Sequence, residues 1–238
     1  ASESWKEPAS DKAYFTDYKK LLEAGFDGYY GDYFELNNRK SAEEFMTSIE
    51  ERNKILSKYN EKKSTIGSFE THDVISPLLV GGENYSKIII WLNATLPLNP
   101  YYIDGFLQAD DYIYEYSNKK ADTTYTDDDY YYVHQGQIDI FNFSRKPGSD
   151  TGILSDEHKI AMNLRNKYID QITKGDFIPL KTDNDKVFAY QREYNNKFVN
   201  VIINRNLAES EDVKVKIKKL TKKSKVNFIK DSEDKKLV

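Results

Sequence analysis

The sequence predicts an α/β protein in which parallel βα units are followed by a small antiparallel β domain. In the first part of the chain, short apolar strands alternate with segments of helical periodicity, the pattern that parallel sheets produce. After Gly175 the chain changes to short alternating or β-branched segments separated by Asn/Asp turns. With 39% hydrophobic residues in 238, there is enough apolar material for a core across one or two domains.

Start and stop signals order the elements of the first part. Apolar spacing predicts a helix that ends at Gly25, because glycine commonly follows the last helical turn. Ser41 and Glu44 have the spacing of a capping box, which predicts a helix start. Pro97 and Pro100 are expected to stop a later helix. In chain order we expect helix 11–23, strand and turn 26–34, helix 41–58, strand 64–69, helix 85–96 and strand 101–103.

After residue 107 comes a Tyr/Asp-rich stretch, 108–150, that has little periodicity. A loop of this length is usually functional or an excursion with its own fold. Ser155 is then expected to cap a helix through Tyr168, with Ile160 and Leu164 on the same face as Tyr168. Antiparallel strands are expected over 177–180, 187–192, 198–204, 213–220 and 226–229.

Charge and composition exclude several classes of function. The chain has 35 basic and 39 acidic residues, a net charge of -4, so we expect neither nucleic acid nor an anionic membrane as a partner. In 213–220, Val213, Val215 and Ile217 are expected to face inward, which makes the alternating lysines a solvated edge rather than a nucleic-acid patch. The absence of cysteine excludes disulfides, thiolate metal sites and cysteine nucleophiles.

The ends and the apolar runs bear on localisation. No apolar run approaches the roughly 20 residues of a membrane-spanning helix, so we expect a soluble protein. The chain starts at Ala1 with neither Met nor a targeting leader, so we expect that the natural N-terminus was processed or lies upstream. The compartment stays open.

Aromatic residues make up 14% of the chain, with 19 Tyr, 12 Phe and 2 Trp. Sugars stack their C–H faces on aromatic rings while their hydroxyls bind phenols, carboxylates and amides, so this composition suits a carbohydrate site. AT-rich coding drift raises Tyr, Asn, Lys and Ile together and explains the composition equally well.

Two short clusters place ionisable side chains where a site is expected. Ser2-Glu3-Ser4-Trp5 sets a carboxylate beside an aromatic ring, and Phe69-Glu70-Thr71-His72-Asp73 sets His and Asp directly after a buried strand. Active residues of parallel barrels collect at the C-terminal ends of the strands. Alone, the first cluster also fits a solvated terminus, and the second fits a capping pair at a strand end.

Taken in order, these clusters resemble motifs of the α-amylase superfamily of retaining α-glucosidases and transglycosylases. Segment 2–5 resembles the small-residue-Glu-x-Trp setting after barrel strand five, and 69–73 resembles the aromatic-x-x-His-Asp motif after strand seven. Segments 24–30, 95–102, 155–168 and 174–204 resemble strand six, the entry into strand eight, the last barrel helix and the opening of the C-terminal β domain. The resemblance implies the second half of a (β/α)8 TIM barrel over 1–172, followed by a small antiparallel all-β sandwich domain over 173–238.

The resemblance also implies roles at the site. Glu3 becomes the general acid/base, with Trp5 beside it helping to desolvate its carboxyl and contacting substrate. Asp73 becomes the second carboxylate, which stabilises the oxocarbenium-like state, and His72 hydrogen-bonds the same sugar ring. The implied substrate is an α-glucan or α-glucoside.

The sequence departs from the family in one important respect. It contains no counterpart of the nucleophilic Asp that the family carries after strand four, so we expect the chain alone to be inactive. The nucleophile and the missing half of the barrel are then expected upstream on the same natural chain. Departures at 74–77 and 102–105 leave the substrate subsite open.

Two alternatives stay open. In the first, the chain is a non-catalytic carbohydrate-binding or relic domain in which Glu3 has no role. In the second, the run Asp127-Asp128-Asp129 binds calcium, since oxygen-rich loops hold that ion. Three consecutive carboxylates do not converge on one ion without a sharp turn, so a solvated loop is favoured, and no other cofactor or metal is expected.

Overall fold

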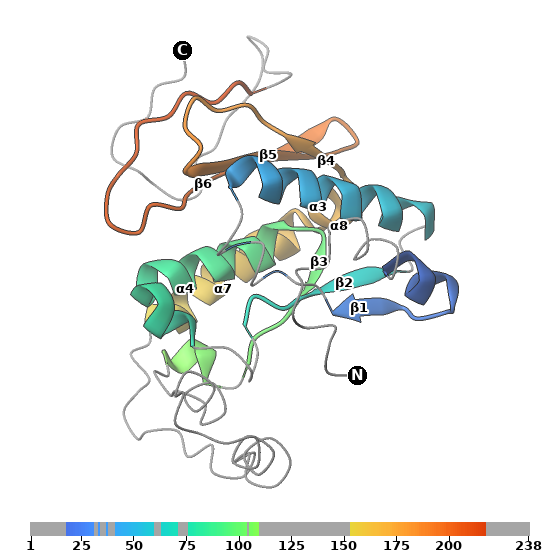
Figure 1. Cartoon of the computed structure of the whole chain (residues 1–238), viewed down its shortest axis with the longest axis horizontal. Helices are drawn as coiled ribbons and strands as arrows, with labels where there is room; N and C mark the ends of the chain where they lie inside the picture. Colours follow the sequence, from blue (N-terminus) through green and yellow to red (C-terminus); the bar gives the residue numbers. More distant parts are fainter. Residues whose placement is uncertain are drawn as a thin grey trace, which may run out of the picture.

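The computed structural model describes residues 18–30, 33, 37, 41–59, 63–70, 76–103, 105–109 and 153–217. They form two three-stranded sheets, one parallel and one antiparallel (Figure 1). The parallel sheet has the order β1 (Gly28–Tyr30), β2 (Ser64–Gly67), β3 (Leu98–Pro100), and the antiparallel sheet has the order β4 (Asp176–Pro179), β5 (Val187–Tyr194), β6 (Lys197–Asn204). The helices are α3 (Ala42–Leu56), α4 (Pro77–Thr95), α7 (Ile153–Lys167) and α8 (Ile169–Lys174), with 3-10 turns η1 (Ser57–Tyr59) and η2 (Phe106–Gln108).

This arrangement confirms the α/β class and the change to antiparallel pairing. Helix α3 connects β1 to β2 and α4 connects β2 to β3, and both strand pairs are parallel, as expected of βα units. The half barrel, the sandwich and the domain division at 172 stay predictions. None of the helices in the described ranges is long and apolar enough to cross a membrane.

Local signals set the first elements as predicted. The helical turns over 18–23 end before Gly25, whose φ of 103° suits glycine. In the capping box, the Ser41 hydroxyl accepts from the Glu44 amide at 3.2 Å and the Glu44 carboxylate accepts from the Ser41 amide at 2.9 Å. Phe45 and Ile49 are buried in the core as expected.

The helix predicted over 85–96 is longer at its N-terminal end. It starts at Pro77 because the Ser76 hydroxyl caps the Leu78 amide at 3.3 Å and proline suits the first helical turn. Gly81 and Gly82 then leave the helical conformation, and Gly82 has a φ of 67°, so α4 is kinked there. The helix ends at Thr95, before the predicted stop at Pro97.

The strand predicted over 101–103 is wrong: the strand that pairs with β2 is β3, three residues earlier. The physical reason is a side-chain clamp. The Asn93 amide bonds both the N–H and the C=O of Tyr101, at 3.3 Å each, and so takes the backbone groups of Tyr101 out of the sheet. The Ile103 amide is taken by Glu70 at 3.0 Å.

Helix α7 also differs from its prediction. It begins two residues before Ser155, so this residue is not the cap, and its hydroxyl instead bonds the Leu107 carbonyl at 3.4 Å. On the predicted face, Leu164 is buried and Tyr168 packs against the core as expected, whereas Ile160 is 50% exposed, which corrects its place. Ala161, the next residue along the helix, is buried instead. The stretch 108–150 lies almost wholly outside the described residues.

The antiparallel sheet confirms the first three predicted strands within one or two residues. The β5–β6 turn has positive φ at both Asn195 (49°) and Asn196 (58°), as a type I′ hairpin requires. The strand predicted over 213–220 is wrong in its described part, where Val215 makes only an isolated bridge to Thr182. The alternation is nevertheless confirmed, since half-buried positions 213, 215 and 217 alternate with exposed lysines. Segment 226–229 lies outside the described residues.

One hydrophobic core joins the two sheets. Phe45 of α3 stacks on Phe188 of β5 with ring centroids 4.3 Å apart, so α3 packs directly under the antiparallel sheet (Figure 1). The same core contains Phe69, which follows β2, and Tyr190 of β5. The Thr95 and Tyr190 hydroxyls bond at 2.6 Å and tie the end of α4 to the antiparallel sheet.

Candidate active site

The carboxyl ends of the parallel strands define one edge of the sheet. Because β1, β2 and β3 run in the same direction, the segments that follow them emerge at this edge. Residues 68–70 follow β2 and residues 101–103 follow β3. Active sites of barrels built from such units lie at this end of the strands.

Glu70 is the central described residue at this edge. Its side chain is buried, with 2% of the residue exposed, and its Oε1 accepts a hydrogen bond from the Ile103 amide at 3.0 Å. Burial raises the pKa of the Glu70 carboxyl to about 8, although the bond from Ile103 partly lowers it. The carboxyl is therefore mostly protonated at neutral pH, and it joins the segment after β2 to the segment after β3.

The charge of the Glu70 carboxyl also affects the pKa values of two tyrosines that follow β3. Burial, and secondly the charge of Glu70, raise the pKa of Tyr101. The pKa of Tyr102 is raised by burial and by Glu70, against a lowering effect of Arg165. The Tyr102 hydroxyl is buried and has no hydrogen-bond partner among the described residues. Its ring stacks on Phe106 at 5.3 Å and meets His158 edge-on at 5.1 Å.

An aromatic cluster of Tyr33 and Phe69 packs around β2. The Tyr33 hydroxyl bonds the Thr65 hydroxyl at 2.7 Å, and the Tyr33 ring packs against Phe69 with centroids 5.0 Å apart. The Arg52 guanidinium lies 5.1 Å from the centre of the Tyr33 ring. Burial raises the pKa of Tyr33, so this phenol stays neutral.

The loop after β3 is fixed by Asn93. Besides holding Tyr101, the Asn93 carboxamide lies directly against β2 at Gly67, where a Cβ would be 2.1 Å from Asn93 Oδ1. Only glycine leaves room for this side chain. Helix α4, strand β2 and the segment that carries Tyr102 are therefore locked together.

Arg165 fixes the connection that leads into β3. Its buried guanidinium donates to the carbonyls of Asn93, Ala94, Leu96 and Leu98, at 3.2, 3.1, 3.1 and 2.6 Å. These include free carbonyls at the C-terminal end of α4, where a cation is favourable. The clamp sets the position at which β3 enters the sheet.

The four site residues predicted from the sequence, Glu3, Trp5, His72 and Asp73, lie outside the described residues. They stay predictions. In the chain, His72 and Asp73 follow Glu70 by two and three residues, so the described edge borders the motif that contains them.

Sequence reasoning missed the roles of Glu70, Asn93 and Tyr102. Glu70 carried a usable signal, because a carboxylate directly after a buried strand needs a partner. The part of the chain that the structure describes contains no group of three His, Cys, Asp or Glu side chains able to hold a metal. The calcium hypothesis at 127–129 falls outside it.

No protein-family model and no curated protein matches the sequence, whereas solved structures do match its fold. A maltogenic α-amylase from Thermotoga neapolitana superposes with a TM-score of 0.57 over 91% of this chain and 50% of its own length, at 16% identity. An isomaltulose synthase from Erwinia rhapontici NX5 gives 0.51 over 73% of this chain and 41% of its own, at 15% identity. A mutant of that synthase in complex with D-glucose gives 0.54 over 78% and 44%, also at 15% identity.

At 15 and 16% identity, the likeness between this chain and these structures is a likeness of fold. This chain spans half or less of the length of each of these structures.

Proposed function

We propose that the chain is part of a retaining α-glucosidase or α-amylase-like enzyme that hydrolyses or transfers α-linked glucosyl units. The observation that carries this proposal is the agreement between motif order and fold. The motif Phe69–Asp73 leaves the carboxyl end of a parallel strand, in a chain that superposes over 91% of its length on a maltogenic α-amylase.

In the proposed mechanism, Glu3 donates a proton to the glycosidic oxygen and then takes one from water or an acceptor sugar. Asp73 holds sugar hydroxyls and stabilises positive charge on the ring, and His72 hydrogen-bonds the same ring. A retaining enzyme also needs a nucleophilic carboxylate about 5–5.5 Å from the acid/base group. We propose that residues outside these 238 supply it, so that the chain alone does not turn over substrate.

The described residues contribute order and charge balance to this site. Glu70, neutral at pH 7, adds no negative charge next to a motif that must keep Asp73 ionised. Through its bond to Ile103 it holds two site-bearing segments together. Tyr102 offers a neutral phenol at the same edge.

The test uses the full-length natural protein and a chromogenic α-glucoside. We expect Glu3→Gln and Asp73→Asn each to lower turnover by a factor on the order of 10²–10⁴. Substrate binding, followed by calorimetry, is expected to be retained in Glu3→Gln. Glu51→Gln, at an exposed position on α3, is the matched control. Unchanged turnover in Glu3→Gln would overturn the proposal. Sugar binding without turnover in the unmodified protein would instead support a carbohydrate-binding domain.

A further inference from the structure

The chain after β6 folds back onto the kink of α4. A Cβ on Gly81 would lie 2.4 Å from Leu207 Cδ1, so the Leu207 side chain fills the space that the glycine leaves. This contact joins the segment that follows β6 to the kink of α4, and Figure 1 shows this segment on the same side of the molecule as α4. The first turn of α4, 76–80, is separated from the rest of the helix by two non-helical glycines.

A second contact from the same loop grips the segment after β1. The Arg205 guanidinium donates to the Asn37 carbonyl at 2.8 Å and lies 4.4 Å from the centre of the Phe188 ring. The Asn37 side chain in turn donates to the Tyr85 hydroxyl at 3.1 Å. Leu207 therefore contacts α4 at its kink, and Arg205 is linked through Asn37 to Tyr85, in the part of the helix that follows the kink.

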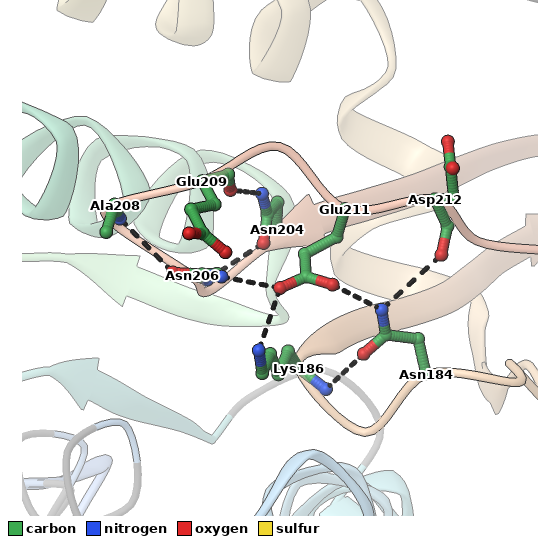
Figure 2. A network of polar contacts seen from close by, with 8 residues as sticks. All are labelled: Asn184, Lys186, Asn204, Asn206, Ala208, Glu209, Glu211 and Asp212. Atoms are coloured by element: carbon green, nitrogen blue, oxygen red, sulfur yellow. Dashed lines mark hydrogen bonds and ion pairs between the residues drawn. The ribbon is translucent and has the colours of Figure 1, made fainter.

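A polar network fixes the loop that carries these two side chains (Figure 2). The Glu211 carboxylate accepts hydrogen bonds from Asn206, from Asn184 at 2.8 Å and from Lys186 at 3.0 Å. The Asn204 side chain accepts from the Asn206 amide at 2.8 Å, and the Asn206 side chain accepts from the Ala208 amide at 3.2 Å. Both neighbours of Leu207 are thus held in place.

The Glu211 network persists over the ordinary pH range. Hydrogen bonds from Asn206, Asn184 and Lys186 lower the pKa of Glu211 to about 2, so the carboxylate stays charged. The hydrogen bond to Glu211 also raises the pKa of Lys186, the residue just before β5.

We propose that Leu207 is a positioning residue for the segment that contains His72 and Asp73. This inference rests on the proposed function. One end of that segment is fixed at Glu70 by the bond from Ile103, and the other end enters α4 at Ser76, three residues after Asp73. Between Ser76 and the body of α4 stand Gly81 and Gly82, two residues with wide backbone freedom. Leu207 limits that freedom, and the Glu211 network holds Leu207 in place.

The experiment uses the full-length natural protein with Leu207→Ala and Glu211→Gln. The matched controls are Ile202→Ala, which removes an apolar side chain that is 47% exposed on β6, and Asp212→Asn, which neutralises the carboxylate next to Glu211. The first readout is amide exchange at Leu79 and Val80, whose N–H groups bond the Ser76 carbonyl at 2.9 and 3.1 Å. We expect the Leu79 and Val80 amides to exchange faster in both test variants and at the unmodified protein's rate in the two controls.

The second readout is turnover of a chromogenic α-glucoside. We expect kcat to fall about 2- to 30-fold in Leu207→Ala, with Glu211→Gln in the same direction and the controls unchanged. Leu207→Met, which refills the space next to Gly81, is expected to restore both readouts. If Leu207→Ala does not fold, Glu211→Gln and Leu207→Met carry the test, since neither empties the core.

The outcomes separate the two proposals. Exchange at 79–80 that is equal in test and control variants overturns the positioning role, whatever the activity. Faster exchange with kcat equal to that of the controls also overturns it and leaves the glycosidase proposal intact. A protein that neither binds nor turns over α-glucosides defeats the proposed function, while the exchange readout still decides whether Leu207 holds the entry of α4.

Discussion

Replacing Glu70 by Gln tests whether the buried carboxyl is neutral in the folded protein. Gln keeps an acceptor for the Ile103 amide and nearly the same shape, but it carries no titrating proton. If Glu70 is protonated when buried, the substitution is close to silent at low pH and becomes stabilising as pH rises.

The sign and the size of this change in stability follow from the pKa of Glu70 in the folded and in the unfolded protein. The folded-state pKa of Glu70, about 8, lies above its ordinary value of 4.5, so its contribution is fully present below pH 4.5 and is lost as pH rises to about 8. At 1.36 kcal/mol per pH unit, this interval corresponds to about 5 kcal/mol in total, of which about 3 kcal/mol is lost by pH 7. The Glu70→Gln protein has no such slope.

The assay is urea unfolding of the full-length protein at intervals from pH 5 to pH 9. We expect the free energy of unfolding of Glu70→Gln to exceed that of the unmodified protein by an amount that grows with pH, with Glu51→Gln as the exposed control. Parallel curves for the Glu70→Gln and unmodified proteins between pH 5 and pH 8 would refute the neutral, buried state of Glu70.

Four further substitutions probe the scaffold. Gly67→Ala places a Cβ 2.1 Å from Asn93 Oδ1 and is expected to lower the free energy of unfolding in urea by about 1–3 kcal/mol. In the control Gly28→Ala the nearest atom is 3.4 Å away, so this variant is expected to be tolerated, and equal losses of stability in the two variants would contradict the packing argument. Arg165→Lys cannot reach four carbonyls and is expected to lower stability by about 3 kcal/mol, and an unchanged thermal midpoint would show that the clamp is dispensable. Asn196→Ala is expected to cost about 1 kcal/mol at a φ of 58° while Asn196→Gly does not, and the same loss in both would show that φ is not the cause. The folded-state pKa of Glu211 is about 2, so its carboxylate stabilises the fold above its ordinary pKa of 4.5 and loses this effect as pH falls toward 2. Glu211→Gln is therefore expected to flatten the fall in the free energy of unfolding at acid pH. A slope equal to that of the unmodified protein would argue against the hydrogen bonds that Asn206, Asn184 and Lys186 donate to Glu211.

Elements set by local chemistry were predicted correctly from the sequence. The Ser41–Glu44 capping box, the stop at Gly25 and the hairpin at Asn195–Asn196 each depend on residues within four positions of one another. The βα alternation also follows from periodicity alone. These features survive in the fold because tertiary packing does not oppose them.

The errors arose where distant side chains decide the backbone. The third strand was placed three residues late because Asn93, eight residues before Tyr101, captures the backbone groups of Tyr101. The earlier part of α4 is separated from the rest by a kink at Gly81 and Gly82, and Leu207 packs against Gly81 from more than 100 positions along the chain. Such contacts have no signature in local periodicity.

The candidate site shows the same division. The roles of His72 and Asp73 were inferred from residue types and their order, and they stay predictions because both residues lie outside the described part of the chain. The role of Glu70 was missed, because its position after a strand suggests only that it needs a partner, whereas its raised pKa depends on burial and its partner is the Ile103 amide, 33 residues away. A carboxylate seen only in sequence is assigned the ordinary pKa of an exposed group.

A neutral Glu70 has a consequence for the proposed chemistry. A retaining mechanism needs one protonated and one ionised carboxyl at the same pH, and each further negative charge nearby raises the pKa of both. Burial removes this charge near pH 7, but ionisation near pH 8 restores it three residues from Asp73 and beside Tyr101 and Tyr102. The full-length Glu70→Gln protein is therefore expected to keep the acid limb of its pH–rate profile for an α-glucoside and to have its alkaline limb at lower pH than the unmodified protein, because it lacks the charge that forms near pH 8 and raises the pKa of the general acid. An alkaline limb at the same pH in both proteins would show that Glu70 does not act on the general acid.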